Sequence, residues 1–339
     1  MTDAAALSEH RKQLFAKRLR LALLLVVLLI AAAFWRLGAG EWDIPASRVA
    51  ELLNPFLDEV SRASPDALVV RSVRLPRFLA AVGSGGLLAV AGVILQGLLT
   101  NPLAEPYTLG IAAGAAFGGA LGFFLGSFAV TPMAFVGAIA ALWLVGLIAS
   151  RSGGGAEYIV LAGVITNAVL SAGVTFLKAI ADDRLSAIVL WLMGSISGAS
   201  PTGALSVWGG ALILFIPAFI LARQIDAVSL SEGHGSLLGV DEKKLRAILL
   251  FLSSLATAVV VSFFGIIGFV GLVVPHMMRR IIGPATRPLL LFSFLCGGLL
   301  LTLADGAAQY FGELPVGVIT AIVGGPFFCK ILVSRRQGE

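Results

Sequence analysis

Long apolar runs, separated by short polar segments, are the dominant pattern of the chain. A transmembrane helix needs about 20 consecutive, mainly apolar residues. Ten runs approach or exceed this length, at residues 19–38, 75–100, 107–127, 131–150, 157–180, 203–223, 246–264, 266–283, 288–305 and 315–333. A shorter apolar stretch at 186–199 is interpreted as a partial or interfacial helix. The pattern predicts an all-α integral membrane protein with about ten transmembrane helices and a membrane domain at 19–333.

Composition supports this class of protein. Of the 339 residues, 58% are hydrophobic and 13% are charged, and the mean hydropathy is +0.98. Soluble globular domains carry about 25% charged residues, so an ordinary soluble fold is excluded, as is a disordered chain. The high pI of about 9.6 does not indicate nucleic-acid binding, because the basic residues are better explained by membrane topology.

The positions of Lys and Arg predict the orientation, since these residues concentrate on the cytoplasmic side. With the N-terminus inside, 16 of the 24 lie in inner segments. The outer ones are Arg36, Arg48, Arg62, Arg71, Arg74, Arg77, Lys178 and Arg184. We therefore expect both termini in the cytoplasm, with tails at 1–18 and 334–339, and a long external segment at 39–74. The basic start and apolar run Leu21–Phe34 resemble a signal peptide, but the run continues to Leu37, so we expect a retained first helix.

Four glycines form a stripe on the third span. Gly110, Gly114, Gly118 and Gly122 recur every four residues. Small residues at this spacing let another helix backbone approach closely. The stripe predicts a tight helix–helix contact.

Several kinds of chemistry are missing from the sequence. The chain has no G-x-x-x-x-G-K-[ST], G-x-S-x-G or H-E-x-x-H motif, so neither a P-loop nor these hydrolytic sites are present. The cysteines and histidines have no zinc-ligand spacing, and we expect neither a metal nor a cofactor on this chain. The span interiors also lack paired carboxylates, with Glu157 at a helix start and Asp305 at a helix end. This argues against an ion-coupled carrier.

Two arginines flank a proline at the outer mouth of the second span. Arg74 and Arg77 lie three residues apart, on one helix face, and Pro76 is expected to fix the helix start between them. Their place on the outer side is unusual, because Lys and Arg concentrate on the cytoplasmic side. They are explained either by contacts with lipid headgroups or by docking of carboxylates on an external partner, which the forked Arg side chain suits. The sequence leaves both readings open.

The inner end of the second span carries two prolines four residues apart, Pro102 and Pro106. Each disfavours helix in the residue before it, so irregular backbone is expected around Asn101 and Leu103. Irregular backbone at membrane depth occurs only where it is buried in protein or lines a cavity. Together with Gln96, this segment is a candidate gate or pathway element.

The inner segment at 226–241 reads as short helices. Ser231 can cap a turn that begins at Glu232, Gly239 suits the position after a helix, and Asp241 can cap the seventh span. The segment is either a simple connector or a short helix that inserts into a partner's groove, with Leu237 and Leu238 as anchors.

These segments together resemble the FecCD family, the permease subunits of ATP-driven importers for iron–siderophores, haem and cobalamin. The resemblance runs from about Arg74 to Lys330. Its motifs are Arg74-Leu75-Pro76-Arg77, Gln96-Gly97, Asn101-Pro102-Leu103-Ala104-Glu105-Pro106, Leu109-Gly110, Leu161-Ala162-Gly163-Val164, Trp191-Leu192-Met193-Gly194-Ser195, Gly268-Phe269-Val270-Gly271-Leu272-Val273-Val274-Pro275-His276 and Glu313-Leu314-Pro315-Val316-Gly317.

The resemblance implies a type II importer permease in the inner membrane of a prokaryote. Two copies of the chain would enclose one passage, two separate ATPase subunits carrying ATP-Mg would bind below, and a substrate-binding protein would dock above. Residues assigned by motif fall into three groups. Docking would use Arg74 and Arg77, the inner gate would include Asn101 and Leu103, and coupling to the ATPase would use Ser231, Glu232, Gly235, Leu237, Leu238 and Gly239. Spans two to five and seven to ten would form inverted repeats.

Two positions depart from the family pattern. Gln309 stands where an outer Arg is frequent, four residues after Asp305, and Gly235 stands where an Ala is frequent in the coupling segment. The expected substrate is an iron chelate, with haem and cobalamin as other possibilities. The main alternative is a stand-alone secondary transporter. A membrane enzyme would require a catalytic constellation that the sequence does not contain.

Overall fold

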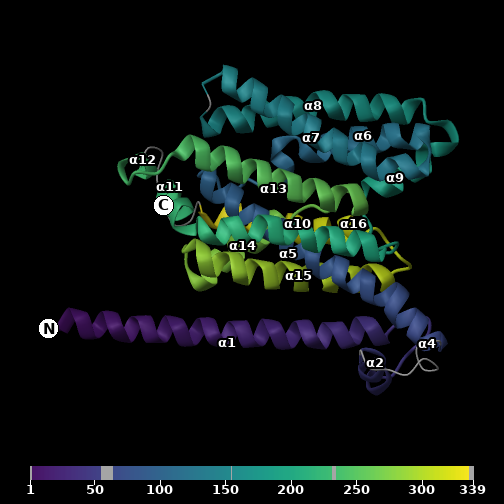
Figure 1. Cartoon of the computed structure of the whole chain (residues 1–339), viewed down its shortest axis with the longest axis horizontal. Helices are drawn as coiled ribbons and strands as arrows, with labels where there is room; N and C mark the ends of the chain where they lie inside the picture. Colours follow the sequence, from purple (N-terminus) through teal and green to yellow (C-terminus); the bar gives the residue numbers. More distant parts are fainter. Residues whose placement is uncertain (1, 55–63, 154, 231–233, 336–339) are drawn as a thin grey trace.

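The computed structural model describes residues 2–54, 64–153, 155–230 and 234–335, and the regular elements in these ranges are all helical (Figure 1). Ten helices of 13 to 37 residues correspond in order to the ten predicted spans. They are α1 (Thr2–Gly38), α5 (Leu75–Leu98), α6 (Ile111–Leu125), α7 (Val130–Arg151), α8 (Ala156–Ala179), α10 (Pro201–Ile220), α13 (Glu242–Phe264), α14 (Val270–Ile282), α15 (Thr286–Tyr310) and α16 (Val316–Arg335). Among the described residues, seven helical stretches are long and apolar enough to cross a membrane.

Shorter helices connect the long ones. They are α2 (Ala46–Leu52), α4 (Pro65–Leu68), the π-helix η1 (Val69–Arg74), the 3₁₀-helices η2 (Pro106–Leu109), η3 (Ser127–Ala129) and η4 (Asp182–Arg184), and α9 (Leu185–Leu192), α11 (Ala222–Leu230) and α12 (His234–Leu237). The partial helix predicted at 186–199 is present as α9, but it ends at Leu192 and is followed by non-helical backbone.

Helix α5 is the centre of the bundle. It is buried along almost its whole length and packs against α10, α13, α14 and α15. Glycines make this possible, because a Cβ at Gly85 would collide with the carbonyl of Gly297 on α15, and a Cβ at Gly92 would collide with the carbonyl of Gly271 on α14. With no side chain between them, the helix backbones approach closely.

The glycine stripe on α6 makes the predicted close contact, and its partner is α7. A Cβ at Gly114 would collide with the carbonyl of Gly137, and a Cβ at Gly118 would collide with that of Met133. Gly110 has a different role, because it lies before the helix with φ +81, a left-handed conformation that glycine adopts without strain.

Helix α5 begins at Leu75 with Pro76 in its first turn, as predicted, but the helical backbone does not start there. Helix α4, η1 and α5 follow one another without a break from Pro65 to Leu98. Proline lacks the N–H that an α-helix uses four residues back. The π-helical turn just before Pro76 changes the hydrogen-bond register, and the Leu75 N–H bonds to the Val70 carbonyl. Such a bulge admits the proline inside a continuous helix.

The eighth span is shorter than predicted. Residues 265–268 are not helical, and α14 begins only at Val270, after Phe269 with φ +68. The segment at 99–110 is likewise free of α-helix, as the paired prolines predicted. The two irregular segments meet, because the Ile267 N–H donates a 3.2 Å hydrogen bond to the Tyr107 hydroxyl.

Two groups of four helices share one feature, a second helix that is much shorter than the other three. Helices α5, α6, α7 and α8 have 24, 15, 22 and 24 residues. Helices α13, α14, α15 and α16 have 23, 13, 25 and 20 residues. In each group an irregular segment leads into the short second helix. This pattern supports the expected repeats, which the span order places in opposite orientations.

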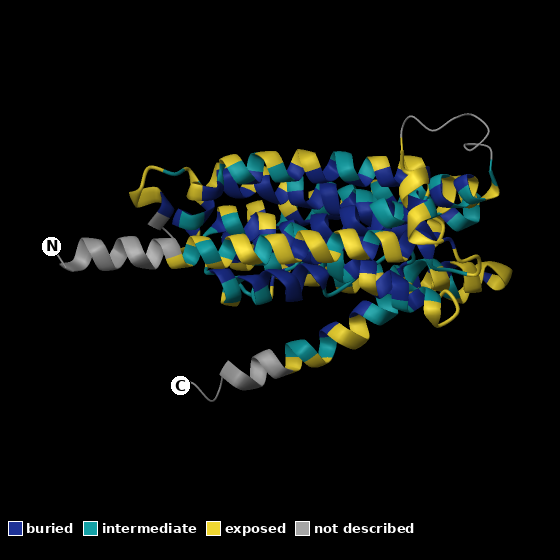
Figure 2. Cartoon of the chain, turned by 90° about the horizontal axis from the view of Figure 1, so that it is seen from below, coloured by how far each residue is buried: buried dark blue, intermediate teal, exposed yellow. Residues whose placement is uncertain are grey.

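Both ends of the chain lie at the same end of the bundle as α11 and α12, whereas α2 and α4 lie at the opposite end (Figure 1). This placement agrees with an even number of crossings. In Figure 2 the buried residues concentrate inside the bundle, and the C-terminal helix diverges from it. Exposed apolar side chains cover the periphery, as expected for surfaces that face lipid or another subunit.

Candidate functional site

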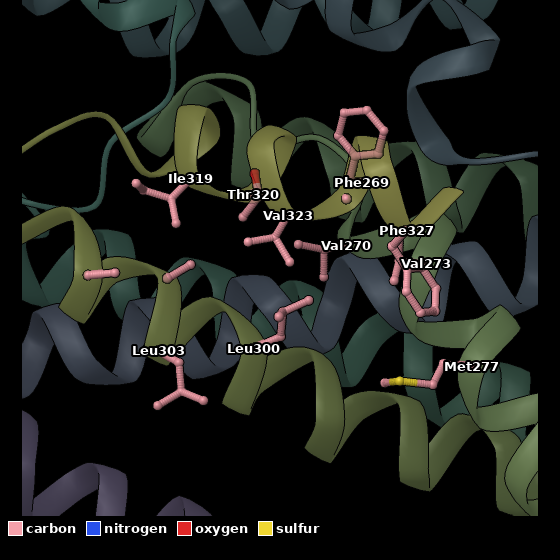
Figure 3. A pocket seen from close by; sticks show the side chains of 13 residues that line it. Phe269, Val270, Val273, Met277, Leu300, Leu303, Ile319, Thr320, Val323 and Phe327 are labelled. Carbon is pink, nitrogen blue, oxygen red and sulfur yellow. The ribbon is translucent and has the colours of Figure 1, made fainter. Parts of the chain in front are cut away.

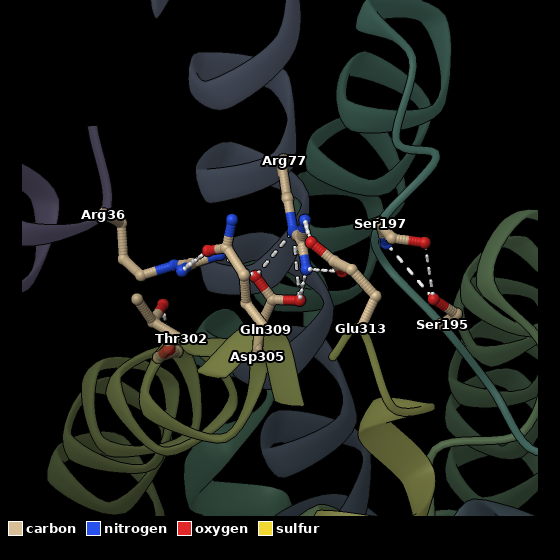
Figure 4. Close-up of polar contacts among 9 residues, drawn as sticks. Arg36, Arg77, Ser195, Ser197, Thr302, Asp305, Gln309 and Glu313 are labelled. Carbon is tan, nitrogen blue, oxygen red and sulfur yellow. Dashed lines mark hydrogen bonds and ion pairs between the residues drawn. The ribbon is translucent and has the colours of Figure 1, made fainter. Parts of the chain in front are cut away.

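A buried charge cluster joins α5 to α15 at the outer end of the bundle (Figure 4). The Arg77 guanidinium donates to both oxygens of Asp305, with Nε 2.9 Å from Oδ2, and Nη2 3.0 Å from Oδ1. It also donates to both oxygens of Glu313, at 2.8 and 2.7 Å. Arg77 and Asp305 are almost completely buried, whereas the Glu313 side chain is 45% exposed.

The cluster contains a second arginine, Arg36, which the sequence indicates only as an outer cation. Arg36 at the end of α1 donates to Asp305 at 2.5 Å and to the Gln309 amide oxygen. Two arginines therefore face two carboxylates, so the charges balance. Position 309, where the family often has an arginine, is thus occupied by a neutral side chain that binds the Arg36 guanidinium.

Arg74 binds a different set of partners, which are backbone carbonyls. Its guanidinium donates to the carbonyls of Leu37 and Gly38 at 2.8 Å and of Trp42 at 2.6 Å. These bonds tie the outer segment after α1 to the start of the second span. The two predicted docking arginines therefore share one face of the helix, but each already has partners inside the chain.

A cavity of about 870 Å³ lies beside this cluster at the outer end. Its lining combines aromatic and charged residues, among them Trp35, Arg36, Trp42, Arg74, Arg77 and Glu313. Of the charged residues, Glu313 lies in the loop between α15 and α16. The hydrogen bond from Arg77 holds the pKa of Glu313 below its usual range. The Glu313 carboxylate is therefore ionised, and its partly exposed side chain can be reached from the cavity.

The predicted gate residues lie at the inner end of α5. Gln96 is buried, its amide nitrogen lies 3.3 Å from the carbonyl of Leu272, and its amide oxygen accepts from Arg279 at 3.2 Å. Asn101 accepts a hydrogen bond from the Leu103 N–H at 2.9 Å, which stabilises the turn. The Leu103 side chain is 43% exposed. Gln96 thus anchors the segment to α14, while Leu103 is presented outward.

A polar stripe on α8 was not singled out from the sequence. Asn167, Ser171 and Thr175 recur every four residues, and Ser171 and Thr175 are exposed. The Asn167 amide donates to the Tyr107 carbonyl at 3.2 Å, next to the gate segment. Exposed polar groups on a membrane helix are favoured where the helix faces water or protein. The four-residue spacing of these polar residues is the sequence signal from which the stripe could have been predicted.

A second cavity, of about 320 Å³, lies between α14, α15 and α16 (Figure 3). Phe269, Met277 and Leu300 are among its lining residues, and no charged side chain lines it. The hydroxyl in the lining, that of Thr320, donates to the Gly317 carbonyl at 3.0 Å, so the cavity is poorly suited to a polar substrate. Among the described residues, no three His, Cys, Asp or Glu side chains gather into a possible metal site.

The predicted coupling segment lies at the inner end. Leu237 and Leu238 are 82% and 67% exposed. Gly239 has φ +77, and the Asp241 carboxylate accepts the Lys244 N–H at 3.0 Å; both agree with the predicted roles in ending and capping helices. Ser231 and Glu232 lie outside the described residues.

Packing explains why position 235 is glycine and not alanine. It is buried, and a Cβ at this position would lie 2.8 Å from both Val228 and the Glu242 carboxylate. The same carboxylate accepts the Ser236 N–H at 3.1 Å. An alanine would therefore displace the contact between α12 and the start of α13.

A link between the coupling segment and α15 was not anticipated. Asp226 on α11 accepts hydrogen bonds from the Thr286 N–H at 2.8 Å and from the Thr286 hydroxyl at 2.5 Å. Thr286 is the first residue of α15, where N–H groups lack partners within the helix. Asp226 therefore caps α15 from another helix, and its charge is favourable at that helix end.

The chain is a bundle of membrane-length helices in which irregular segments interrupt two of the spans. Its outer end carries the charge cluster, and its inner end carries the exposed coupling leucines. These features define a multi-pass membrane permease of the type II importer fold. Residues 24–334 match the model of the FecCD transport family, and the chain belongs to this family.

Named relatives agree with the assignment. The chain is 35% identical over 328 residues to a probable iron chelatin transport system permease protein of Helicobacter pylori, covering 94% of this chain and 99% of that protein. It is 34% identical to the hemin transport system permease protein HmuU of Yersinia pestis, covering 94% and 97%. A solved metal-chelate type ABC transporter in an inward-facing conformation superposes with a TM-score of 0.81 at 31% identity, covering 96% and 99%.

Family membership settles the class of function. The chain is a non-catalytic membrane subunit of an ABC transporter, and the ATPase is a separate subunit. The alternative of a stand-alone secondary transporter finds no support among these relatives.

Proposed function

We propose that this chain is the transmembrane subunit of an importer that moves an iron chelate into the cell, with haem and cobalamin as the other substrates to be tested. The observation that carries the proposal is the family match over residues 24–334. Relatives named for an iron chelate and for hemin support the substrate class.

The working complex contains two copies of this chain, two ATPase subunits and an external binding protein. Both termini and the segment at 226–241 face the cytoplasm in this arrangement, and 39–74 faces outward. The common location of both ends and α12 supports this assignment. ATP and Mg²⁺ bind to the ATPase subunits.

The binding protein docks over the outer charge cluster. Asp305 is buried and fixed to both arginines, whereas Glu313 is half exposed and accepts from Nη1 and Nη2 of Arg77. A carboxylate of the binding protein can therefore replace Glu313 on Arg77 without disturbing Asp305. Glu313 occupies the docking arginine in the free permease and yields it on docking. Arg74 holds the adjacent loop in position through its bonds to backbone carbonyls.

The passage runs along the polar stripe of α8 toward the gate at Asn101 and Leu103. The exposed Leu103 meets its counterpart from the second copy when the gate is closed. The test is disulfide formation in L103C, in a background with Cys329→Ser because Cys329 is the exposed native cysteine. Covalent dimers should form and decrease when ATP drives the cycle. L205C on α10, which is 73% exposed, is the matched control. Equal crosslinking of both variants, or none of L103C, contradicts the gate.

The substrate is identified by a screen of reconstituted transport. Proteoliposomes containing the permease, its ATPase and its binding protein are supplied with an iron–siderophore complex, haem or cobalamin. We expect uptake of the iron chelate and saturable binding of it to the binding protein. Uptake of only haem or cobalamin would correct the substrate, and uptake of none of the three would contradict the proposal.

A further inference from the structure

An open groove of about 650 Å³ lies between the inner ends of α7, α8 and α13, and Leu109 of η2 also lines it. Its lining includes none of the charge-cluster residues and neither coupling leucine. Its walls are mostly apolar, and include Leu142, Trp143, Leu147, Ile159 and Phe251. Two basic residues, Lys243 and Arg246, line the same groove. The groove therefore combines an apolar trough with a positively charged end.

Arg246 lacks a counter-ion within the part of the chain that the structure describes. The residue is 7% exposed, and its Nε is buried without a hydrogen-bond partner. No ion pair to a described residue satisfies its charge either. A buried and unpaired cation is costly, so the site is incomplete without an anion. Lys243 lies three residues earlier on the same helix face and adds a second positive charge at the groove.

The apolar part of the groove is open. Gly146 on α7 lines it, and a Cβ placed on Gly146 would meet nothing within 4 Å. Trp143, in the middle of α7, is 68% exposed and adds a large apolar surface to the groove. An occupant with an anionic end and a long apolar part fits both features.

We propose that this groove binds an anionic phospholipid of the cytoplasmic leaflet, with its phosphate against Arg246 and Lys243 and an acyl chain along α7. Basic pockets between membrane helices on the cytoplasmic side are suited to such headgroups. The placement in this leaflet rests on the proposed topology. Helix α13 begins at the cap Asp241, directly after the coupling segment, so the lipid steadies the helix that receives movement from the ATPase.

The test is native mass spectrometry of the purified full-length chain with phosphatidylglycerol, phosphatidylcholine or inorganic phosphate. Phosphatidylglycerol should be retained in preference to phosphatidylcholine. Neutralising either cation with R246Q or K243Q should reduce this retention about fivefold. K244Q, on the same helix but outside the groove, should leave it unchanged. Because the Lys243 side chain is exposed, K243Q carries the test even where R246Q disturbs folding.

A second pair of variants tests the acyl chain. G146L should fill the groove without a clash and lower phosphatidylglycerol retention, whereas G209L on α10, another position where a Cβ meets nothing within 4 Å, should not. The proposal is overturned by equal retention of both lipids, by retention unchanged in K243Q and G146L, or by inorganic phosphate that binds alone and excludes the lipid. None of these readings depends on which substrate is transported.

Discussion

Asp305 on α15 accepts hydrogen bonds from Arg77 on α5 although 228 residues separate them in the chain. The Asp305 side chain is 2% exposed and also meets Arg36 from α1. One carboxylate thus holds three helices together at the outer end, where the binding protein is proposed to dock. Stability and docking consequently share the same residues.

Replacing Asp305 with Asn should strongly destabilise the protein. Both arginines would remain buried without a full counter-charge, and breaking a buried pair in this way costs about 3–5 kcal/mol. Thermal unfolding in detergent should detect the loss. E313Q removes a half-exposed carboxylate and should change the free energy of unfolding by about 1 kcal/mol or less. Similar stability of the two variants would contradict the central place of Asp305.

Stability should depend on pH through Glu313. Because Arg77 lowers its pKa in the folded chain, the ion pair stabilises the protein above the ordinary Glu pKa of about 4.3. That contribution is lost as the pH falls through the lowered pKa of the folded state. The melting temperature of the wild type should therefore fall more steeply with acidification than that of E313Q. An equal pH dependence of the melting temperature in both proteins would show that the Glu313 ion pair does not contribute to stability.

The E313Q variant should also bind the cognate binding protein more tightly. It removes the internal carboxylate that competes for Arg77, while Asp305 still holds the guanidinium in place. Surface-immobilised permease in nanodiscs provides the measurement, and R77Q should weaken docking in the same assay. Weaker docking by E313Q, or unchanged docking by both variants, would mean that Arg77 has only a structural role.

Leu237→Asp and Leu238→Asp should abolish co-purification of the ATPase. These exposed leucines have the character of anchors that fill a partner's groove, and a carboxylate there would be desolvated on binding. Phe128→Asp, at an 84% exposed position beyond the outer end of α6, is the matched control and should retain the ATPase. Retention by both leucine variants would place the contact elsewhere.

Asp226→Asn should separate ATPase binding from transport. The change weakens the cap on α15, a kind of interaction worth about 1 kcal/mol, but leaves Leu237 and Leu238 in place. We expect the ATPase to co-purify normally while ATP-driven uptake falls severalfold. Threonine-to-valine substitution at Thr286 removes the hydroxyl partner and should act in the same direction. Normal uptake by both variants would show that α11 does not transmit force to α15.

The sequence predicts the spans well because apolar run length is a local property. The close contact of α6 through Gly114 and Gly118 could also be predicted, as could the Asp241 cap, since each depends on nearby spacing. The partner of the glycine stripe, α7, could not be assigned, because several spans would satisfy the same pattern.

The remaining features depend on contacts far apart in the chain. Pro76 indicates a helix start by local rules, but a π-helical turn admits it inside a longer helix. Asp305 looks like an ordinary residue at a helix end until Arg77 and Arg36 are placed beside it. The charges of Arg74 and Arg77 could be recognised, whereas their internal partners required the fold.

Transport driven by the separate ATPase is tested most directly by uptake into proteoliposomes that contain the permease and binding protein with either active or hydrolysis-deficient ATPase. We expect accumulation of the iron chelate only with active ATPase and ATP, and background uptake with the deficient subunit. Full-rate accumulation in vesicles that lack the ATPase would contradict it.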